Sequence, residues 1–110
     1  MLFGARPNLE SLRPGSEAPD LLITALKSLA DSTRLIILRY LSDQPMSPSE
    51  LARRLQLRPP TVIHHLRALR LAGLVHIIIG ESNERRYAAR LEMLQDITKS
   101  LQEFLSKKSL

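Results

Sequence analysis

The sequence predicts a mainly α-helical fold with one β-hairpin. Between residues 20 and 72, apolar residues recur at helical spacing, and capping or turn residues separate the runs. Val75–Ile79 is rich in β-branched residues. It is followed by Gly80-Glu81-Ser82-Asn83, which suits a turn, and by a second strand-like segment, Glu84–Ala89. Residues 91–110 then return to the periodicity of an amphipathic helix.

Three parts are expected along the chain. Residues 1–19 should form an arm or linker, because three prolines and two glycines interrupt this segment. Residues 20–90 should form the folded domain, and residues 91–110 a C-terminal helix. A chain of 110 residues is long enough for one small domain with a modest core. Whether the chain is a fragment of a longer protein is left open.

Capping residues mark the starts of the first three helices. Asp20 is a suitable N-cap for the first helix, and Asp31 or Ser32 for the second. Ser47-Pro48-Ser49-Glu50 has the pattern of a capping box with proline at the first helical position. The third helix is therefore expected to begin near Pro48.

A fourth helix is expected from Pro59 to Ala72, after a short connection at residues 56–58. Prolines are tolerated at the start of a helix because the backbone nitrogens there have no intrahelical partner. Gly73 stands where a left-handed residue commonly ends a helix. Helices, a short turn, another helix and a hairpin follow one another in the order of a winged helix-turn-helix. In that fold the third and fourth helices read DNA and the hairpin is the wing.

The net charge of +5 is concentrated in the middle of the chain. Residues 51–90 carry eight arginines and two glutamates, a net +6, whereas residues 1–50 carry −1 and residues 91–110 carry zero. A charged run is usually a solvated face. An excess gathered in one segment is nevertheless the distribution expected of a surface that binds phosphates.

The fourth helix is expected to have an apolar back and a polar front. Because successive residues are about 100° apart, Val62, Leu66 and Leu69 share one side. The outer face and its flanks hold Pro60, Thr61, Ile63, His64, Arg67 and Arg70. An arginine such as Arg67 can bind guanine through two hydrogen bonds, and an apolar side chain such as Ile63 can touch a thymine methyl group.

Arginines outside the fourth helix extend the candidate surface. Arg85 and Arg86 should contact the minor groove or phosphates, one of them pointing away because neighbours on a strand alternate faces. For Arg53 and Arg54, contact with the DNA backbone and plain solvation remain open. The residues expected to contact DNA are Arg53, Arg54, Arg58, Pro60, Thr61, Ile63, His64, Arg67, Arg70, Arg85 and Arg86.

The last helix carries an apolar stripe. Its apolar residues recur at spacings of three and four, which favours a seam between two subunits over a lid on its own domain. The residues expected in the dimer interface are Leu22, Leu26, Leu94, Ile97, Leu101, Phe104 and Leu105.

Four segments, Leu26–Leu38, Ser49–Ala52, Thr61–Leu66 and Leu71–Val75, resemble the ArsR-type (arsenic-repressor-like) winged-helix regulators. The resemblance covers roughly residues 22–90. It implies a homodimer in which terminal helices form the interface and two recognition helices read an inverted repeat. It also implies repression of transcription until an effector binds, without identifying the effector.

The chain departs from the family at several positions. Family members usually have glycine where Gln56 stands, and serine where Arg58 and Ile63 stand. Many sense metals through cysteines in the third helix or through histidines and acidic residues in the last helix. This chain has no cysteine, and its last helix has no histidine. His64 and His65 point about 100° apart, so neither a metal site nor a cofactor is expected. His65 should be structural.

Other classes of function have little support. There is no cysteine nucleophile, no glycine-rich phosphate loop and no carboxylate pair placed for acid–base catalysis, so the protein is not expected to be an enzyme. No apolar run approaches about 18 residues, so a soluble, cytoplasmic protein without a membrane partner is expected. Double-stranded DNA and a second copy are the expected partners. The alternative is a winged-helix module that docks proteins within a larger regulator, with weak or no DNA binding.

Overall fold

The computed structural model describes residues 20–107. Within them the order of elements is α1 (Asp20–Leu29), α2 (Ser32–Asp43), α3 (Pro48–Leu55), α4 (Pro59–Leu71), β1 (Val75–Ile79), β2 (Arg85–Ala89) and α5 (Leu91–Ser106). The predicted mainly helical class with one hairpin is confirmed. The arm expected at residues 1–19 lies outside the described residues.

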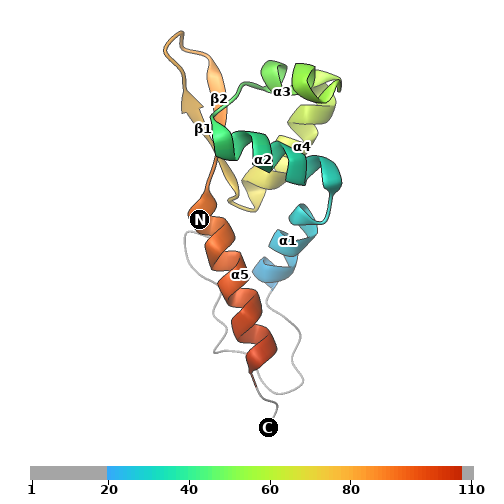
Figure 1. The fold of residues 1–110 in the computed structure, drawn as a ribbon, viewed down its shortest axis with the longest axis vertical. Helices are drawn as coiled ribbons and strands as arrows, with labels where there is room; N and C mark the ends of the chain where they lie inside the picture. The colour runs from blue at the N-terminus through green and yellow to red at the C-terminus, as the bar shows by residue number, and fades with distance from the viewer. Residues whose placement is uncertain (1–19, 108–110) are drawn as a thin grey trace.

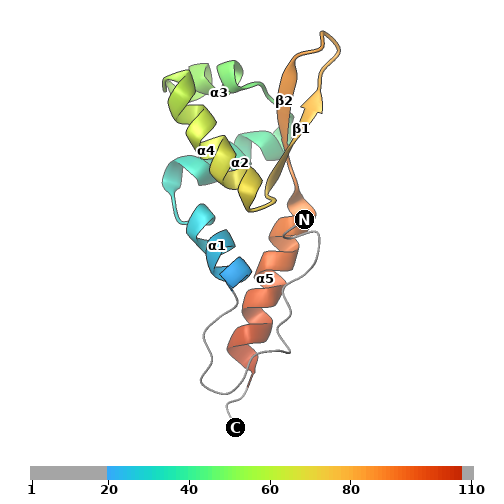
Figure 2. The same ribbon diagram turned by 180° about the vertical axis from the view of Figure 1, so that it is seen from behind.

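The elements gather at two ends of the molecule. α2, α3 and α4 lie beside the hairpin at one end, whereas α5 extends away from the hairpin and lies along α1 (Figures 1 and 2). The antiparallel hairpin pairs Val75 with Ala89 and Ile79 with Arg85. An isolated bridge between Met46 and Tyr87 attaches the hairpin to the α2–α3 connection. In it, the Met46 N–H donates to the Tyr87 carbonyl at 3.0 Å, and the Tyr87 N–H donates to the Met46 carbonyl at 2.7 Å.

Side-chain caps explain where two of the helices begin. Asp31 is extended, and its carboxylate accepts the backbone N–H of Arg34 at 3.0 Å, so Asp31 rather than Ser32 caps α2. Ser47 and Glu50 form the predicted capping box at the start of α3. Each cap satisfies a backbone N–H that the first turn of a helix leaves without a partner.

The turn between α3 and α4 requires a left-handed residue, and Gln56 adopts that conformation at φ 55°. The backbone N–H of Leu57 donates to the Ala52 carbonyl at 3.0 Å and closes the turn. A side chain with a Cβ adopts this conformation at a cost of about 1 kcal/mol or more, which glycine avoids. A strained residue with a Cβ therefore occupies the left-handed position of this turn.

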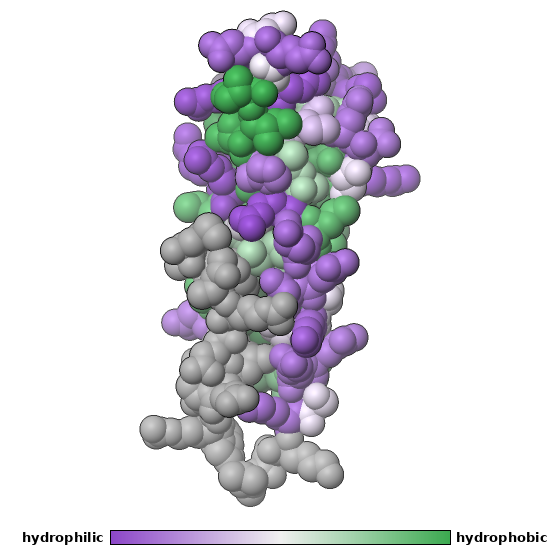
Figure 3. Space-filling view, turned by 90° about the vertical axis from the view of Figure 1, so that its left-hand side faces the viewer, coloured by the Kyte–Doolittle hydropathy of each residue, from purple (hydrophilic) through white to green (hydrophobic). Residues whose placement is uncertain are grey.

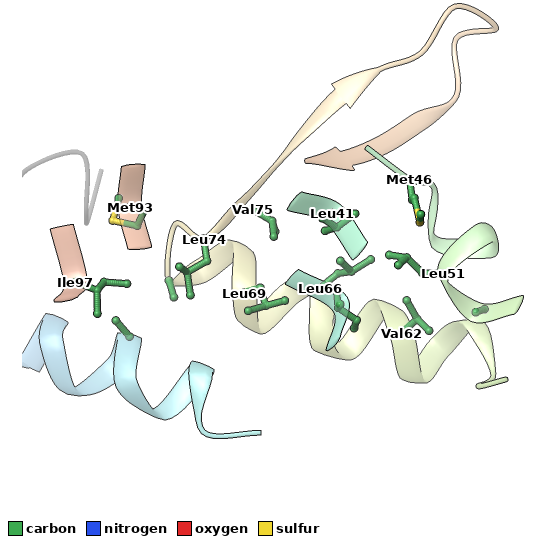
Figure 4. Close-up of a cluster of buried hydrophobic side chains, with 14 of the residues drawn as sticks. Leu41, Met46, Leu51, Val62, Leu66, Leu69, Leu74, Val75, Met93 and Ile97 are labelled. Carbon is green, nitrogen blue, oxygen red and sulfur yellow. The ribbon is translucent and has the colours of Figure 1, made fainter. Parts of the chain in front are cut away.

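One apolar core runs from the hairpin end to the α1–α5 end. Figure 4 shows Met46, Leu51, Val62, Leu66 and Leu69 around one end of α4 and along it, with Met93 and Ile97 beside α1. The predicted back of α4, Val62, Leu66 and Leu69, is fully buried. The core therefore anchors α4 from behind and leaves its outer face to solvent.

Candidate nucleic-acid interface

The outer face of α4 is exposed along its whole length. The polar or small apolar side chains predicted there are all exposed in the structure, namely Pro60, Thr61, Ile63, His64, Arg67 and Arg70. Arg58 is the N-cap residue of α4 and is exposed, but its side chain makes no capping hydrogen bond. With Pro59 and Pro60 in the first turn, two of the amides that a helix N-terminus offers an anion are missing. Anion binding on this helix therefore depends on side chains.

A cleft of about 310 Å³ lies where α4, β2 and the start of α3 meet. Its lining consists of Pro48, Ile63, Arg67, Arg70, Arg85 and Tyr87. Within residues 20–107, no carboxylate forms an ion pair with Arg67, Arg70 or Arg85. The three guanidinium groups thus carry uncompensated charge around a floor of apolar and aromatic side chains. This arrangement suits a polyanion that enters between the helix and the wing.

Adjacent arginines of β2 lie on opposite faces of the hairpin. Arg85 lines the cleft with Arg67 and Arg70. Arg86 forms ion pairs with Glu50 at 3.0 Å and Glu84 at 3.1 Å, so two carboxylates match its charge. Only one of the two arginines is therefore presented with the outer face of α4. The Arg86–Glu50 pair joins residues far apart in the sequence. Only the capping role of Glu50 was predicted.

Arg53 and Arg54 are exposed on the outer side of α3. They line a shallow hollow of about 230 Å³ together with Glu50. The Arg54 guanidinium also lies 5.8 Å from the centre of the Tyr40 ring, within the range of a cation–π contact. Part of its role is consequently to pack α3 on α2.

The two adjacent histidines of α4 have different surroundings. His64 is exposed, whereas His65 is half-buried and its Nδ1 accepts a hydrogen bond from Nε of Arg34 at 3.1 Å. This hydrogen bond joins α4 to α2. The two rings lie 5.5 Å apart at 63°. In the described part of the chain, no three His, Asp or Glu side chains gather where they could hold one metal ion.

The face formed by α1 and α5 is apolar and partly uncovered. Leu26, Leu94, Leu101 and Phe104 are half-buried and pack against the core from outside. Leu105 is 71% exposed. Leu91, at the start of α5, is 50% exposed.

Two residues predicted for the dimer interface belong to the interior of the subunit. Leu22 and Ile97 are 0% and 1% exposed, and both belong to the buried core of the subunit, where α1 and α5 are in contact. Both side chains are therefore covered within the subunit, and their part in a dimer interface stays a prediction. The spacing along α5 shows which residues are apolar but not whether the same chain or a second one covers them.

Figure 3 views the molecule from the hairpin side. Hydrophilic side chains dominate the coloured part of this surface; the largest apolar area lies at the height of the hairpin, and smaller apolar areas lie below it. β1 carries three successive isoleucines, of which Ile79 is 61% exposed.

Among residues 20–107, no helix has the length and apolar character needed to cross a membrane.

Three features together define a winged helix-turn-helix DNA-binding domain. The core anchors α4 through its apolar back, a short turn joins α3 to α4, and Arg85 of the hairpin lines the cleft beside α4. The sequence profile described as "Bacterial regulatory protein, arsR family" matches residues 31–76. The chain is 39% identical over 75 residues to HlyU of Vibrio cholerae, described as a transcriptional activator, across 68% of this chain and 67% of HlyU.

Two further similar proteins are also described as transcriptional regulators. KmtR of Mycobacterium tuberculosis, an HTH-type transcriptional regulator, is 42% identical over 55 residues, across 50% of this chain and 42% of KmtR, so the match spans less than half of that relative. The solved ArsR-like regulator from Rhodococcus sp. RHA1 superposes with a TM-score of 0.71 at 31% identity, over 78% of this chain and 80% of that one.

The homodimeric winged helix-turn-helix domain of Mb0332 from Mycobacterium bovis has the same fold, with a TM-score of 0.63 at 22% identity over 76% of this chain and 78% of that one. The chain belongs to the ArsR family of transcriptional regulators. It is therefore a regulator with a winged helix-turn-helix DNA-binding domain, and not an enzyme.

Proposed function

We propose that the protein is a homodimeric repressor that binds an inverted-repeat operator in double-stranded DNA. The observation that carries this proposal is the cleft between α4 and the wing, where Arg67, Arg70 and Arg85 lie together without an acidic partner in the described chain. A domain that only docked proteins would not need uncompensated arginines on the helix and the wing together. Binding to the chromosome would place the protein in the cytoplasm.

In this proposal α4 enters the major groove with its exposed face. Arg67 reads a guanine through two hydrogen bonds, and Ile63 contacts a thymine methyl group. Arg70 and Arg85 bind phosphates on either side of the groove, and Arg53, Arg54 and Arg58 add backbone contacts from α3 and the turn. Pro60, Thr61 and His64 complete the surface that faces the base edges.

Two copies are proposed to pair through the apolar face of α1 and α5. The exposed side chains of Leu91 and Leu105 support this, together with the half-buried Leu94 and Phe104. The structurally similar Mb0332 domain is described as homodimeric. A two-fold dimer presents its recognition helices to half-sites of opposite orientation, about one helical turn or a multiple of it apart. An inverted repeat follows from that symmetry.

Repression is proposed because a dimer seated across a promoter excludes the polymerase. HlyU is described as an activator, so the direction of regulation is itself an outcome to be measured. A small-molecule effector that releases the DNA is compatible with this function, and its identity is left open.

The test is selection of bound duplexes from a random pool, followed by a promoter–reporter assay with the enriched sequence. We expect an inverted repeat to be enriched, and reporter output to fall when the protein is present. Enrichment of one unrepeated half-site would refute dimeric reading, and a rise in output would refute repression. If no sequence is enriched and no duplex is bound, the protein-docking module would replace the proposal.

A further inference from the structure

Arg86 lies at the centre of a hydrogen-bonded network that joins the wing to the helix-turn-helix. Its Nη2 pairs with Oε1 of Glu50 at 3.0 Å and donates to the backbone carbonyl of Pro45 at 3.3 Å. Its Nη1 pairs with Oε2 of Glu84 at 3.1 Å. The side chain is 27% exposed, so its charge is only partly offered to solvent. One guanidinium thus joins two distant segments, the start of α3 with the connection before it and the hairpin.

On the helix side, the network ends in the cap of α3. Oε1 of Glu50, the atom that pairs with Arg86, also accepts the backbone N–H of Ser47 at 2.9 Å. The first turn of α3 and the hairpin therefore share a carboxylate. Met46 precedes Ser47 in the sequence and Tyr87 follows Arg86, so the bridge between Met46 and Tyr87 adjoins this contact. Together they fix β2 against the start of α3.

On the wing side, the network reaches the turn of the hairpin. Glu84 folds back so that its Oε1 accepts the backbone N–H of Ser82 at 3.0 Å, while its other oxygen pairs with Arg86. A Cβ on Gly80 would collide with this carboxylate, so glycine at that position leaves room for it. The turn and the α3 cap are thus connected through the side chains of Glu84, Arg86 and Glu50.

We propose that Arg86 is a positioning residue for DNA binding. It contacts no nucleic acid, and it sets the hairpin so that Arg85, its neighbour on the opposite face, lines the cleft with Arg67 and Arg70. The inference rests on the proposed function and assigns Arg86 a role different from the direct DNA contact expected from the sequence.

The experiment is a double-mutant cycle between Arg85→Ala and Arg86→Met, with affinity measured across a salt series on the duplex that wild-type protein selects from a random pool. Arg85→Ala should weaken binding about tenfold, since it removes a charge-assisted phosphate contact. It should also make the slope of log K against log salt shallower by about 0.9. Arg86→Met alone should weaken binding several-fold. In the Arg85→Ala background, Arg86→Met should weaken binding by less than about twofold and leave the slope of log K against log salt unchanged. Arg85, the residue through which Arg86 acts, is already absent there.

Three further variants separate positioning from folding. Arg86→Lys should recover part of the affinity lost in Arg86→Met, because a cation can again reach Glu50. Arg90→Met is the matched control, since Arg90 is also 27% exposed and pairs only weakly with Glu92 at 4.0 Å. It should leave affinity unchanged. Should Arg86→Met fail to fold, Glu50→Gln gives the same test, because glutamine keeps the capping box and lacks the charge that pairs with Arg86.

The losses of affinity caused by Arg85→Ala and Arg86→Met could instead be additive, with Arg86→Met making the slope of log K against log salt shallower by a further amount of about 0.9, the value for one phosphate contact. Arg86 would then bind a phosphate directly, and the positioning role would be wrong. The same conclusion follows if Arg90→Met weakens binding as much as Arg86→Met. If wild-type protein binds no duplex at all, the proposed function is refuted and this inference falls with it. The two failures are therefore distinguishable.

Discussion

Ser47 and Glu50 cap each other at the first turn of α3. The Ser47 hydroxyl oxygen accepts the Glu50 backbone N–H at 3.2 Å, and the Glu50 carboxylate accepts the Ser47 backbone N–H at 2.9 Å. Because Arg86 pairs with the same carboxylate, the helix start and the wing depend on one side chain. Local helix stability and the geometry of the DNA-binding surface are thereby coupled.

Ser47→Ala should destabilise the protein by about 1 kcal/mol, since a backbone N–H at the helix start loses its acceptor. For a domain of this size, the thermal midpoint should fall by about 4–8 °C, which calorimetry can measure. Ser49→Ala is the control, because the exposed Ser49 hydroxyl contacts only that of Ser47, at 3.1 Å. Equal losses in the two variants would contradict the capping account.

Stability should decrease in acid through two capping carboxylates. The hydrogen bond from the Arg34 backbone lowers the pKa of Asp31 below its ordinary 3.8, and the bond from the Ser47 backbone lowers the pKa of Glu50 below 4.5. A carboxyl with a lowered folded-state pKa contributes its stabilisation above the ordinary pKa and loses it as the pH falls toward the folded-state pKa. The free energy of unfolding should therefore fall below about pH 5.

Asp31→Asn tests this assignment, because asparagine still accepts a capping hydrogen bond but does not titrate. In chemical denaturation at a series of pH values, the variant should lose stability less steeply between about pH 5 and 3 than the wild type. An identical acid dependence would mean that Asp31 contributes nothing to it.

Gln56→Gly should stabilise the protein. The left-handed conformation at φ 55° strains a residue with a Cβ, and glycine relieves that strain while adding some freedom to the unfolded chain. The net gain should be about 0.5–1 kcal/mol by urea denaturation. Gln56→Ala keeps the Cβ and should gain nothing. A stabilised alanine variant, or a glycine variant without gain, would show that strain at this turn is not what limits stability.

Leu105→Glu should weaken the proposed dimer without unfolding the subunit, because this side chain is 71% exposed. Replacing an apolar contact by a charge should raise the dissociation constant of the dimer about tenfold or more, measured by sedimentation at micromolar concentration. Ile79→Glu is the matched control, since Ile79 is 61% exposed but lies on the hairpin. A dimer that resists Leu105→Glu and dissociates with Ile79→Glu would place the interface elsewhere.

Arg67→Ala should reduce specificity. If Arg67 reads a guanine, its loss should weaken binding to the selected duplex by about 1–3 kcal/mol and to a scrambled duplex by much less. Competition binding with both duplexes measures the difference. Equal losses on the two duplexes would assign Arg67 to the DNA backbone instead.

Most elements were predictable from sequence because their signals are local. Asp31, the Ser47–Glu50 box and Gly73 each mark a helix boundary through a neighbour within a few residues. The apolar back of α4 followed from periodicity alone. These features need no knowledge of the rest of the chain.

What could not be predicted depends on contacts between distant segments. Nothing in the spacing of Leu22 and Ile97 indicates that both are buried within one subunit. The pairing of Arg86 with Glu50, and the hydrogen bond from Arg34 to His65, arise only once the helices are packed. Side-chain chemistry was therefore readable from the sequence, and the partner of each side chain was not.

The most direct test of the central claim is the salt dependence of DNA binding by the Arg70→Ala/Arg85→Ala double variant. Because this variant removes from the cleft two side chains that are proposed to bind phosphates, the slope of log K against log salt on the selected duplex should become shallower by about 1.8 relative to the wild type. An Arg39→Ala control, which removes an exposed arginine of α2, should keep the wild-type slope. If the double variant also keeps the wild-type slope, the cleft between α4 and the wing is not where this protein holds DNA.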